Sequence, residues 1–389
     1  MNRICIKNAK AVLPDGLRTV NIISEDGNII EISDNVPKEY EAIDAKGQLV
    51  TPGFIETHVH GGGGSDFCDA TAESFQNVVK THLSHGTTLI CPTAMSCKED
   101  MLYKFFDAYR ETKNTPIGEI MYGIHLEGPY LNPKMCGAQR PDIIRNPGIS
   151  EVDRLFDAGA DIICRITAAP EIEGVEYLAK KAVDNGILLS IGHSDATAEE
   201  AIKAIDMGFS HVTHMYSATT TVRKINQRVC AGINEVAYLY DDYNIELIGD
   251  GRHVAKETMQ MAVKIKGADK INLTGDSMRA AGQIGVTESY LGDICPENRV
   301  IIDDDVAKLP DMSVYAGSIA TMDKIFKNAV VSYEIPVEKV VTMLSTTPAK
   351  IIGADNYGEI SIGKRCDILI WNEDFSLNKI IVGGKLYEI

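Results

Sequence analysis

The chain has 389 residues, 44% of them hydrophobic and 24% charged, which is typical of a folded globular protein with room for one barrel and an appendage. A formal net charge of -17 argues against nucleic acid or an anionic membrane as a partner, because both select basic surfaces. No apolar run reaches the roughly 18 residues of a membrane span, and no signal peptide is evident. The nine cysteines form no CxxC pair. We therefore expect a cytoplasmic protein with free thiols.

The two ends of the chain have a similar β-rich character. Two β-rich runs flank Asp26-Gly27, a pair typical of a hairpin turn. The C-terminal segment is rich in β-branched residues and is interrupted by glycines and by residues 372–374, Asn-Glu-Asp. We therefore predict that residues 1–50 and 356–389 together form one small β-sandwich domain.

Residues 51–355 alternate between strand and helix patterns, most clearly in the second half. One of the helices has well-defined ends, because Thr197 and Glu200 form a capping box and Gly208 is a stop signal. The predicted strands of this part are 162–171, 187–194, 211–215, 244–251 and 271–277, and the predicted helices are 176–186, 196–208 and 256–270. Such alternation predicts a parallel sheet, either closed as a barrel or open and doubly wound.

Metal-binding and acid–base residues recur where these strands end. They are His58, His60, Glu127, His193, His214, Asp250, His253 and Asp276. In a (β/α)8 barrel the carboxyl ends of the strands converge on one mouth, whereas an open sheet would spread these residues along a line. We therefore predict an α/β protein whose residues 51–355 form a (β/α)8 TIM barrel of the metal-dependent hydrolase type.

These residue types suit a divalent metal. His58 and His60 lie two apart on a strand, so both imidazoles point to the same face. Glu127, His193 and His214 add a carboxylate and two more imidazoles from other strands. This set suits a divalent ion, zinc first with iron, manganese or cobalt as alternatives. Asp276 is then placed to move a proton, which predicts metal-assisted hydrolysis of an amide or a similar C–N bond.

The other histidines are expected to have supporting roles. His82 and His85 lie in the last turn of a predicted helix, where cations are favoured, and we expect them to be structural. His211 is expected on the surface or in a structural role. His125 shares a strand face with Glu127 and is a candidate to support the metal ligands. The four glycines 61–64 form either a flexible linker or a loop that lets a substrate approach the backbone.

Several segments together resemble one family. Residues 44–64, DAKGQLVTPGFIETHVHGGGG, resemble the opening signature of the amidohydrolase superfamily. The finer pattern is similar to the N-acetylglucosamine-6-phosphate deacetylases within it, in this family's order and from about residue 45 onward. The matching segments are GIHLEGPYLNPKMCGAQ, TAAPE, IGHSDAT, THMYSA, IGDGRH, LTGDSMRAAG, AGSIATMDK and STTPAKIIGADNYGEISIGKRCDILI.

This resemblance implies roles for individual residues. Glu127, His193 and His214 match the ligands of the main metal, and Asp276 matches the catalytic acid–base. His58 and His60 would help to hold a second metal, and Glu127 replaces the carbamylated lysine of other superfamily members. The implied substrate contacts are Ala138, Gln139, Asp250, Gly251, Arg252, His253, Ala316 and Gly317. The implied reaction is hydrolysis of N-acetylglucosamine 6-phosphate to glucosamine 6-phosphate and acetate in amino-sugar catabolism, by a dimer or tetramer.

One segment departs from the family pattern. Relatives follow the metal-binding histidine with Asn-Ala-Met and then Arg-Glu-Pro-Gly, whereas this chain has Ser217 and Ala218 and lacks the second motif. Both residues still match substrate-contacting positions. A relocated arginine could bind the phosphate, and the candidates are Arg223, Arg228, Arg252 and Arg279. The alternatives are N-acetylgalactosamine 6-phosphate, an unphosphorylated acetamido sugar or an N-acyl amino acid as substrate, and a non-catalytic barrel that serves as a scaffold.

Overall fold

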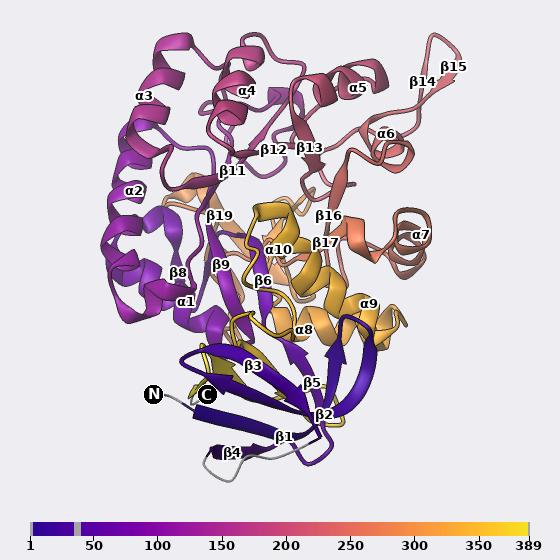
Figure 1. The fold of residues 1–389 in the computed structure, drawn as a ribbon. Helices are drawn as coiled ribbons and strands as arrows, with labels where there is room; N and C mark the ends of the chain where they lie inside the picture. Colours follow the sequence, from indigo (N-terminus) through magenta and orange to yellow (C-terminus); the bar gives the residue numbers. More distant parts are fainter. Residues whose placement is uncertain (1–2, 35–39, 388–389) are drawn as a thin grey trace.

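Eight parallel strands form a barrel in the computed structural model, which describes residues 3–34 and 40–387 (Figure 1). In order around the barrel they are β6 (Phe54–Val59), β9 (Thr87–Ala94), β10 (Ile124–Glu127), β11 (Ile163–Ala168), β12 (Leu188–Ile191), β13 (Phe209–Val212), β16 (Asn244–Ile248) and β17 (Ile271–Thr274). The last and first strands meet where Asp276 N–H donates to the carbonyl of His58 at 3.1 Å and where Val59 bridges Ser277. The barrel prediction is confirmed.

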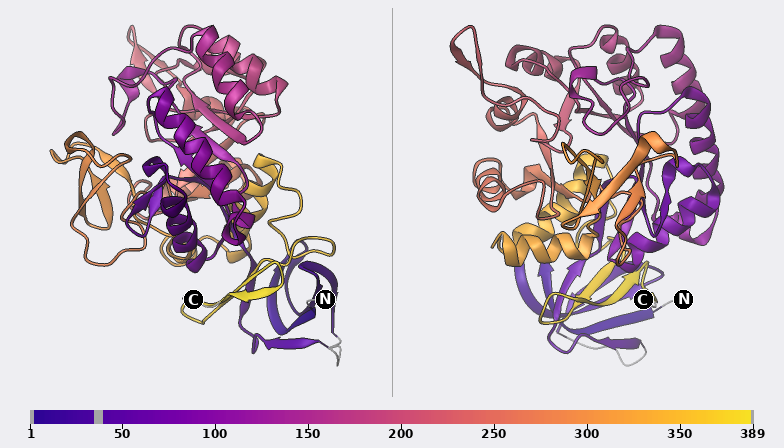
Figure 2. Two further views of the ribbon diagram at one scale, coloured as in Figure 1. Left: turned by 90° about the vertical axis from the view of Figure 1, so that its left-hand side faces the viewer. Right: turned by 180° about the vertical axis from the view of Figure 1, so that it is seen from behind.

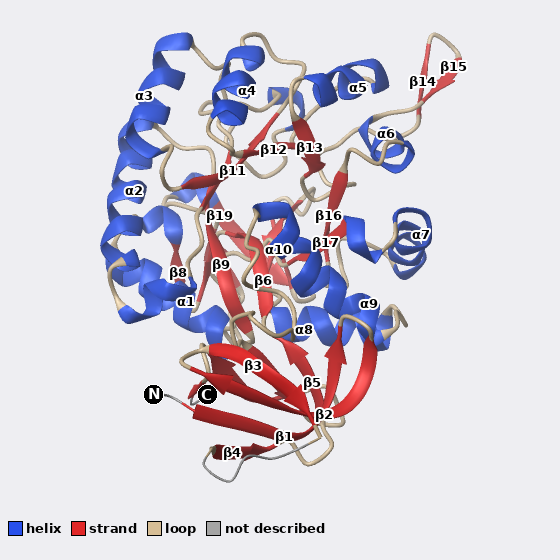
Figure 3. Cartoon of the chain, viewed as in Figure 1, coloured by secondary structure: helices blue, strands red, loops and turns tan. Residues whose placement is uncertain are grey.

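Helices surround this barrel on the outside (Figure 3). They are α1 (Ala72–Ser84), α2 (Glu99–Lys113), α3 (Ile149–Gly159), α4 (Val175–Asp184), α5 (Ala198–Asp206), α6 (Ile233–Leu239), α7 (Lys256–Lys266), α8 (Met322–Lys327), α9 (Val337–Val341) and α10 (Thr347–Ile352). Helix α5 has the capping box expected from the sequence, with Thr197 N–H donating to Glu200 Oε2 at 2.8 Å and Glu200 N–H to Thr197 Oγ1 at 3.3 Å. Turns of π-helix, Asn328–Ser332 and Thr342–Thr346, continue α8 and α9.

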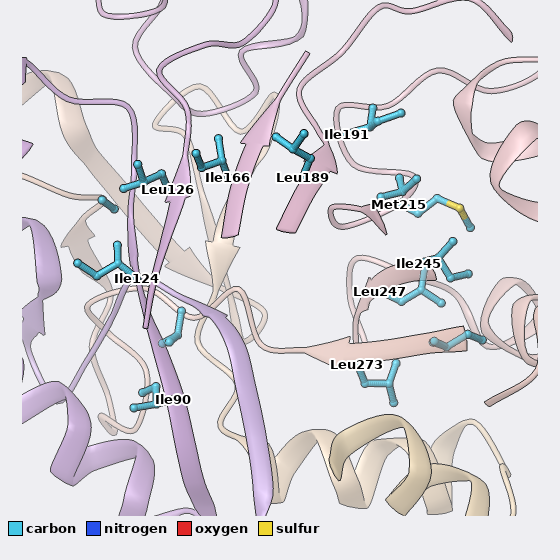
Figure 4. Packing of buried hydrophobic residues seen from close by; sticks show 14 of the residues in the cluster. Ile90, Ile124, Leu126, Ile166, Leu189, Ile191, Met215, Ile245, Leu247 and Leu273 are labelled. Carbon is cyan, nitrogen blue, oxygen red and sulfur yellow. The ribbon is translucent and has the colours of Figure 1, made fainter. Parts of the chain in front are cut away.

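The alternation of side chains along each strand separates an apolar shell from a polar barrel interior. On β10 and β16 the apolar residues Ile124, Leu126, Ile245 and Leu247 pack into the surrounding core (Figure 4). The residues between them belong to the polar interior. It contains His125, Arg165, Thr167, Ser190, His211, Thr213, Glu246 and Asn272, all of them buried. The floor of the site is therefore built from buried, hydrogen-bonded polar groups rather than from the branched apolar layers that fill many barrels.

Strands from both ends of the chain form a second sheet beside the barrel (Figure 1). Its order is β24 (Lys385–Tyr387), β23 (Leu377–Val382), β22 (Ile368–Trp371), β5 (Leu49–Pro52), β1 (Arg3–Leu13), β2 (Gly16–Glu25) and β3 (Asn28–Ser33), with β4 (Glu41–Asp44) also paired to β1. The hairpin at Asp26-Gly27 joins β2 to β3. The small β domain from both termini is thus present as one connected sheet, while its boundaries at residues 50 and 356 stay a prediction.

Aromatic side chains join this terminal sheet to the barrel. The Phe326 ring of α8 lies 4.4 Å from the Trp371 ring of β22 and 5.3 Å from the Phe54 ring of β6, measured between centroids. All three side chains are buried. Trp371 also donates its indole N–H to Thr51 Oγ1 at 3.0 Å, which satisfies its polar atom.

Two further β units follow late barrel strands and were not predicted from the sequence. After β17 comes a four-stranded antiparallel sheet of β18 (Glu288–Tyr290), β19 (Arg299–Asp303), β20 (Val306–Lys308) and β21 (Tyr315–Ser318), drawn in orange in Figure 2. After β13 comes a hairpin of β14 (Arg223–Ile225) and β15 (Arg228–Cys230), which projects from the body in Figure 1. Within the described part of the chain, no helix is both long and apolar enough to cross a membrane.

Candidate active site

The strand-end residues singled out from the sequence converge at one mouth of the barrel. Two groups of potential metal ligands share Glu127: one contains His58 and His60, and the other contains His193 and His214. All five side chains are buried. Asp276, which follows β17, lies beside the first group, with Oδ1 3.1 Å from His60 Nε2 and 3.4 Å from His58 Nε2.

In the group formed by Glu127, His193 and His214, each imidazole is oriented by a backbone carbonyl. His193 Nδ1 donates to the carbonyl of Met135 at 2.8 Å, and His214 Nδ1 donates to that of Ser217 at 3.0 Å. Each ring therefore turns Nε2 toward Glu127 Oε1, at 3.1 and 2.8 Å. Fixing the Nδ1–H tautomer in this way leaves the Nε2 lone pair free for a metal ion.

The second group is arranged differently. His58 Nε2 lies 3.3 Å from His60 Nε2, which in turn lies 3.4 Å from Glu127 Oε2. His58 donates Nδ1–H to the carboxylate of Glu246 at 2.8 Å. His60 Nδ1, by contrast, is buried and has no hydrogen-bond partner among the described residues. No sequence motif pointed to Glu246.

The backbone is unusual at three of these positions. His193, His214 and Asp276 each lie two residues beyond the end of a barrel strand and adopt positive φ values of 49°, 28° and 47°. Such left-handed conformations cost side-chain-bearing residues about 1 kcal/mol or more and are concentrated at functional sites. Here they turn each side chain from the strand end into the mouth.

The charges of the site fit divalent metal ions. Burial by itself would raise the pKa of Glu127, but the imidazoles of His58, His193 and His214 hold that pKa well below its usual range. Burial would lower the pKa of His60, yet the carboxylates of Asp276 and Glu127 raise it to about 9. The same carboxylates and Glu246 outweigh burial and raise the pKa of His58. The buried carboxylates of this site are therefore stabilised by positive charge beside them, which protons or metal ions can supply.

This donor set has the composition of a candidate binuclear centre. Four imidazole nitrogens and carboxylate oxygens lie close together among buried residues, and Glu127 belongs to both groups, so it would be a ligand at both positions. Mixed nitrogen and oxygen ligation suits zinc, iron, manganese or cobalt. The chemistry of the donors thus fits the expected metal.

Four of the five candidate ligands, His60, Glu127, His193 and His214, line a cavity of about 310 Å³ together with Asp276. Six of the substrate-contact residues expected from the sequence line it: Ala138, Gln139, Ser217, Ala218, His253 and Gly317. Gln139 also donates its side-chain amide to Glu127 Oε2 at 2.9 Å, so it contacts the metal-ligand carboxylate directly. Further lining residues that sequence reasoning missed are Met95, Tyr216, Ile248, Leu291, Val314 and Tyr315. Leu291, Val314 and Tyr315 belong to the inserted sheet and its loops, for which the sequence carried no motif.

Four further residues expected to contact the substrate, Asp250, Gly251, Arg252 and Ala316, do not line the cavity. Asp250 accepts the Nδ1–H of His253 at 2.7 Å and so orients this ring from behind. Arg252 donates to Asp304 at 2.8 Å. Ala316 is buried in the apolar cluster beneath the inserted sheet.

The other candidate arginines are also placed outside the cavity. Arg279 forms two hydrogen bonds with Asp69, at 2.6 and 2.8 Å, and Arg223 pairs with Asp195 at 2.6 Å. Arg228 lies exposed on the projecting hairpin. No lysine or arginine is found among those described residues that line the cavity. The binding of a substrate phosphate by one of the four candidate arginines therefore stays a prediction.

Among the remaining histidines singled out from the sequence, His82, His125 and His211 are buried and His85 is half-buried. His125 hydrogen-bonds Thr167 at 2.8 Å, and its ring packs edge-on against His58, 4.6 Å away, so it supports that ligand. His211 lies inside the barrel rather than on the surface, and burial lowers its pKa to about 3. His82 donates to the carbonyl of Gly61 at 2.9 Å, and His85 pairs with Asp323 at 3.0 Å. Both have the structural role expected of them.

The chain belongs to the amidohydrolase family, whose model matches residues 49–387. It is 30% identical to an N-acetylglucosamine-6-phosphate deacetylase of Lysinibacillus sphaericus, over 98% of this chain and 97% of that one. It is 28% identical to an N-acetylgalactosamine-6-phosphate deacetylase of Shewanella sp. (strain ANA-3), over 98% and 95%. A solved structure with a TM-score of 0.89 and 26% identity, over 99% of each chain, is an Asp-to-Ala variant of the N-acetyl-D-glucosamine-6-phosphate deacetylase of Mycobacterium smegmatis in complex with N-acetyl-D-glucosamine-6-phosphate.

Proposed function

We propose that this protein hydrolyses the acetamide of an amino-sugar phosphate, releasing acetate and the free amine. The placement of Asp276 carries the proposal: it lines the cavity and lies beside His58 and His60, in one of the two candidate ligand groups that share Glu127. The preferred substrate is N-acetylglucosamine 6-phosphate, and the product is glucosamine 6-phosphate. Similarity over the whole chain to deacetylases of such sugars supports this choice.

Each candidate residue has its own role in the proposed hydrolysis. Glu127, His193 and His214 would hold one divalent ion, and His58 and His60 together with Glu127 would hold another. When bound, the metal polarises the acetamide carbonyl and makes water more acidic. Asp276 accepts the proton of the attacking water and later gives it to the departing nitrogen, so that one carboxylate serves both proton transfers. Burial alone would raise its pKa, but His58 and His60 keep that pKa below the usual range, which favours the carboxylate form that can accept a proton.

Other cavity residues would hold the sugar in place. Asp250 accepts the Nδ1–H of His253, so His253 Nε2 can accept a hydrogen bond from a sugar hydroxyl. The Tyr315 ring lies 4.9 Å from the His253 ring and restricts its movement. Ile248 and Leu291 offer an apolar wall to the acetyl methyl group or to the face of the sugar.

A second candidate substrate is an unphosphorylated acetamido sugar. It is favoured by the composition of the cavity wall, since the described residues lining it include no lysine or arginine. The two hexosamine isomers are also to be compared, because the chain resembles deacetylases of both.

The test is acetate release by the metal-loaded protein. N-acetylglucosamine 6-phosphate, its galacto isomer, N-acetylglucosamine and an N-acetyl amino acid are offered in parallel. A preference for the gluco phosphate of at least about tenfold in kcat/KM, or about 1.4 kcal/mol, supports the proposal. A preference for the neutral sugar supports the second candidate. No acetate from any of them, with metal bound, refutes deacetylation and leaves the scaffold alternative.

A further inference from the structure

Glu246 lies directly behind the metal-ligand histidines, although no motif pointed to it. It is fully buried at the centre of β16. Its Oε1 accepts the Nδ1–H of His58 at 2.8 Å and the backbone N–H of His214 at 3.1 Å. One carboxylate oxygen therefore contacts both ligand groups of the site.

The other oxygen of Glu246 is held from the opposite side. Oε2 accepts hydrogen bonds from Arg165 Nη1 at 2.5 Å and from Asn272 Nδ2 at 3.2 Å. Arg165 is itself buried and fixed by Ser190 Oγ at 3.0 Å and Thr213 Oγ1 at 2.8 Å. With four donors around it, the carboxylate has one orientation, and the guanidinium compensates its charge.

This arrangement determines which nitrogen of His58 faces the metal position. Because Glu246 is an acceptor, His58 carries its hydrogen on Nδ1 and presents the Nε2 lone pair toward His60, Asp276 and Glu127. A flipped ring would turn a carbon toward the carboxylate and lose the hydrogen bond. Anchoring of this kind by a carboxylate orients a ligand and raises its basicity.

The two ligand groups depend on this anchor to different degrees. The rings of His193 and His214 are oriented through Nδ1 by the backbone carbonyls of Met135 and Ser217, and Glu246 contacts only the backbone N–H of His214. In the His58–His60 pair, His60 Nδ1 has no partner among the described residues, so Glu246 is the anchor of this pair. Loss of Glu246 should therefore affect one metal position more than the other.

We propose that Glu246 is a positioning residue that makes His58, His60 and Glu127 a second metal position, distinct from that of Glu127, His193 and His214. The inference rests on the metal site of the proposed function but not on its substrate. Under this proposal Glu246, a buried residue of the barrel interior, determines whether the site holds one metal ion or two.

The experiment is a metal titration of the full chain without substrate. Wild type, Glu246→Gln and the control Ser190→Ala are dialysed against buffered free Zn²⁺, and bound zinc is measured by mass spectrometry. Ser190→Ala removes a buried partner of Arg165 from the same network but leaves the hydrogen bond between His58 and Glu246 intact. We expect two ions in wild type and in Ser190→Ala, and a 10–100-fold weaker second ion in Glu246→Gln with the first one retained.

Circular dichroism checks the fold, and Glu246→Asp, which keeps the charge, is measured in parallel. Partial recovery of the second ion in Glu246→Asp supports the proposal. The proposal is overturned if Glu246→Gln binds two ions with wild-type affinity, or if Ser190→Ala loses the second ion as fully as Glu246→Gln does. It is also overturned if Glu246→Gln loses both ions, if wild type binds only one ion, or if both Glu246 variants misfold. A protein that shows the expected metal pattern but releases no acetate would refute the proposed function alone.

Discussion

Replacement of Asp276 by asparagine isolates the proton transfer from the rest of the site. The amide has the shape of the carboxylate and can keep the contacts of Oδ1 with His60 Nε2 at 3.1 Å and His58 Nε2 at 3.4 Å. It cannot accept the proton of water. A positioned general base contributes about 10²–10⁴-fold, so we expect kcat to fall by this factor, equivalent to about 2.7–5.4 kcal/mol in the barrier.

The assay is acetate release under saturating substrate, with bound metal and the thermal midpoint measured on the same samples. KM should change little, because the carboxylate acts on the reacting atoms rather than on the sugar. Asp367→Asn is the matched control, since Asp367 is similarly buried but directly precedes β22 of the terminal sheet, where it accepts the backbone N–H of Gly383. Turnover of Asp276→Asn within about threefold of wild type, with full metal content, would refute the assignment of Asp276 as the base.

Three further predictions concern the metal, the pH dependence and the core. His193→Asn should lose the ion held with Glu127 and at least about 100-fold in activity, since asparagine tolerates the positive φ of this position but is not an imidazole ligand. Metal analysis and acetate release measure the two losses, and retained metal would contradict the prediction. The bond to Asp323 raises the pKa of His85; His85 lowers the pKa of Asp323 in spite of burial. The bond therefore stabilises the fold fully between pH 3.8 and pH 6.5, the ordinary pKa values of the two groups. This stabilisation is lost as pH rises through the raised pKa of His85 and as pH falls through the lowered pKa of Asp323. His85→Gln should thus cost about 1 kcal/mol or less near pH 5–6 and still less at pH 9, and a pH-independent difference in urea unfolding would contradict it. Phe326→Ala should reduce the free energy of unfolding by about 3–5 kcal/mol in urea titrations, and a loss below about 1 kcal/mol would mean that the terminal sheet does not depend on this contact.

The sequence predicted the barrel because the metal-binding and acid–base residues occur at the ends of the predicted strands. Ligand-type residues follow strand after strand, and only a closed sheet brings such positions to one point. The terminal sheet was predictable from β-rich ends that flank a segment of different periodicity. The capping box of Thr197 and Glu200 is local, and local hydrogen bonds can be read from a short stretch of chain.

What the sequence could not predict depends on contacts between distant segments. Glu246 and Arg165 each look like ordinary surface residues, and only closure of the barrel brings them within 2.5 Å of each other. The strands of the inserted sheet are three to five residues long and are stabilised by an apolar cluster that includes Met278 and Leu291. Arg279 was a reasonable candidate for a phosphate, but its engagement by Asp69 depends on a partner 210 residues away.

The pairing of β5 with β22 has a consequence for synthesis of the chain. Thr51 and its hydrogen-bond partner Trp371 are 320 residues apart. At about 5–20 residues per second, a ribosome needs about 16–64 s to cover that distance. During this interval the N-terminal strands have no β22 to pair with, and β5 presents an open edge of backbone donors and acceptors to other chains. The nascent polypeptide thus passes through a period in which aggregation competes with completion of the fold, and chaperones would act on it there.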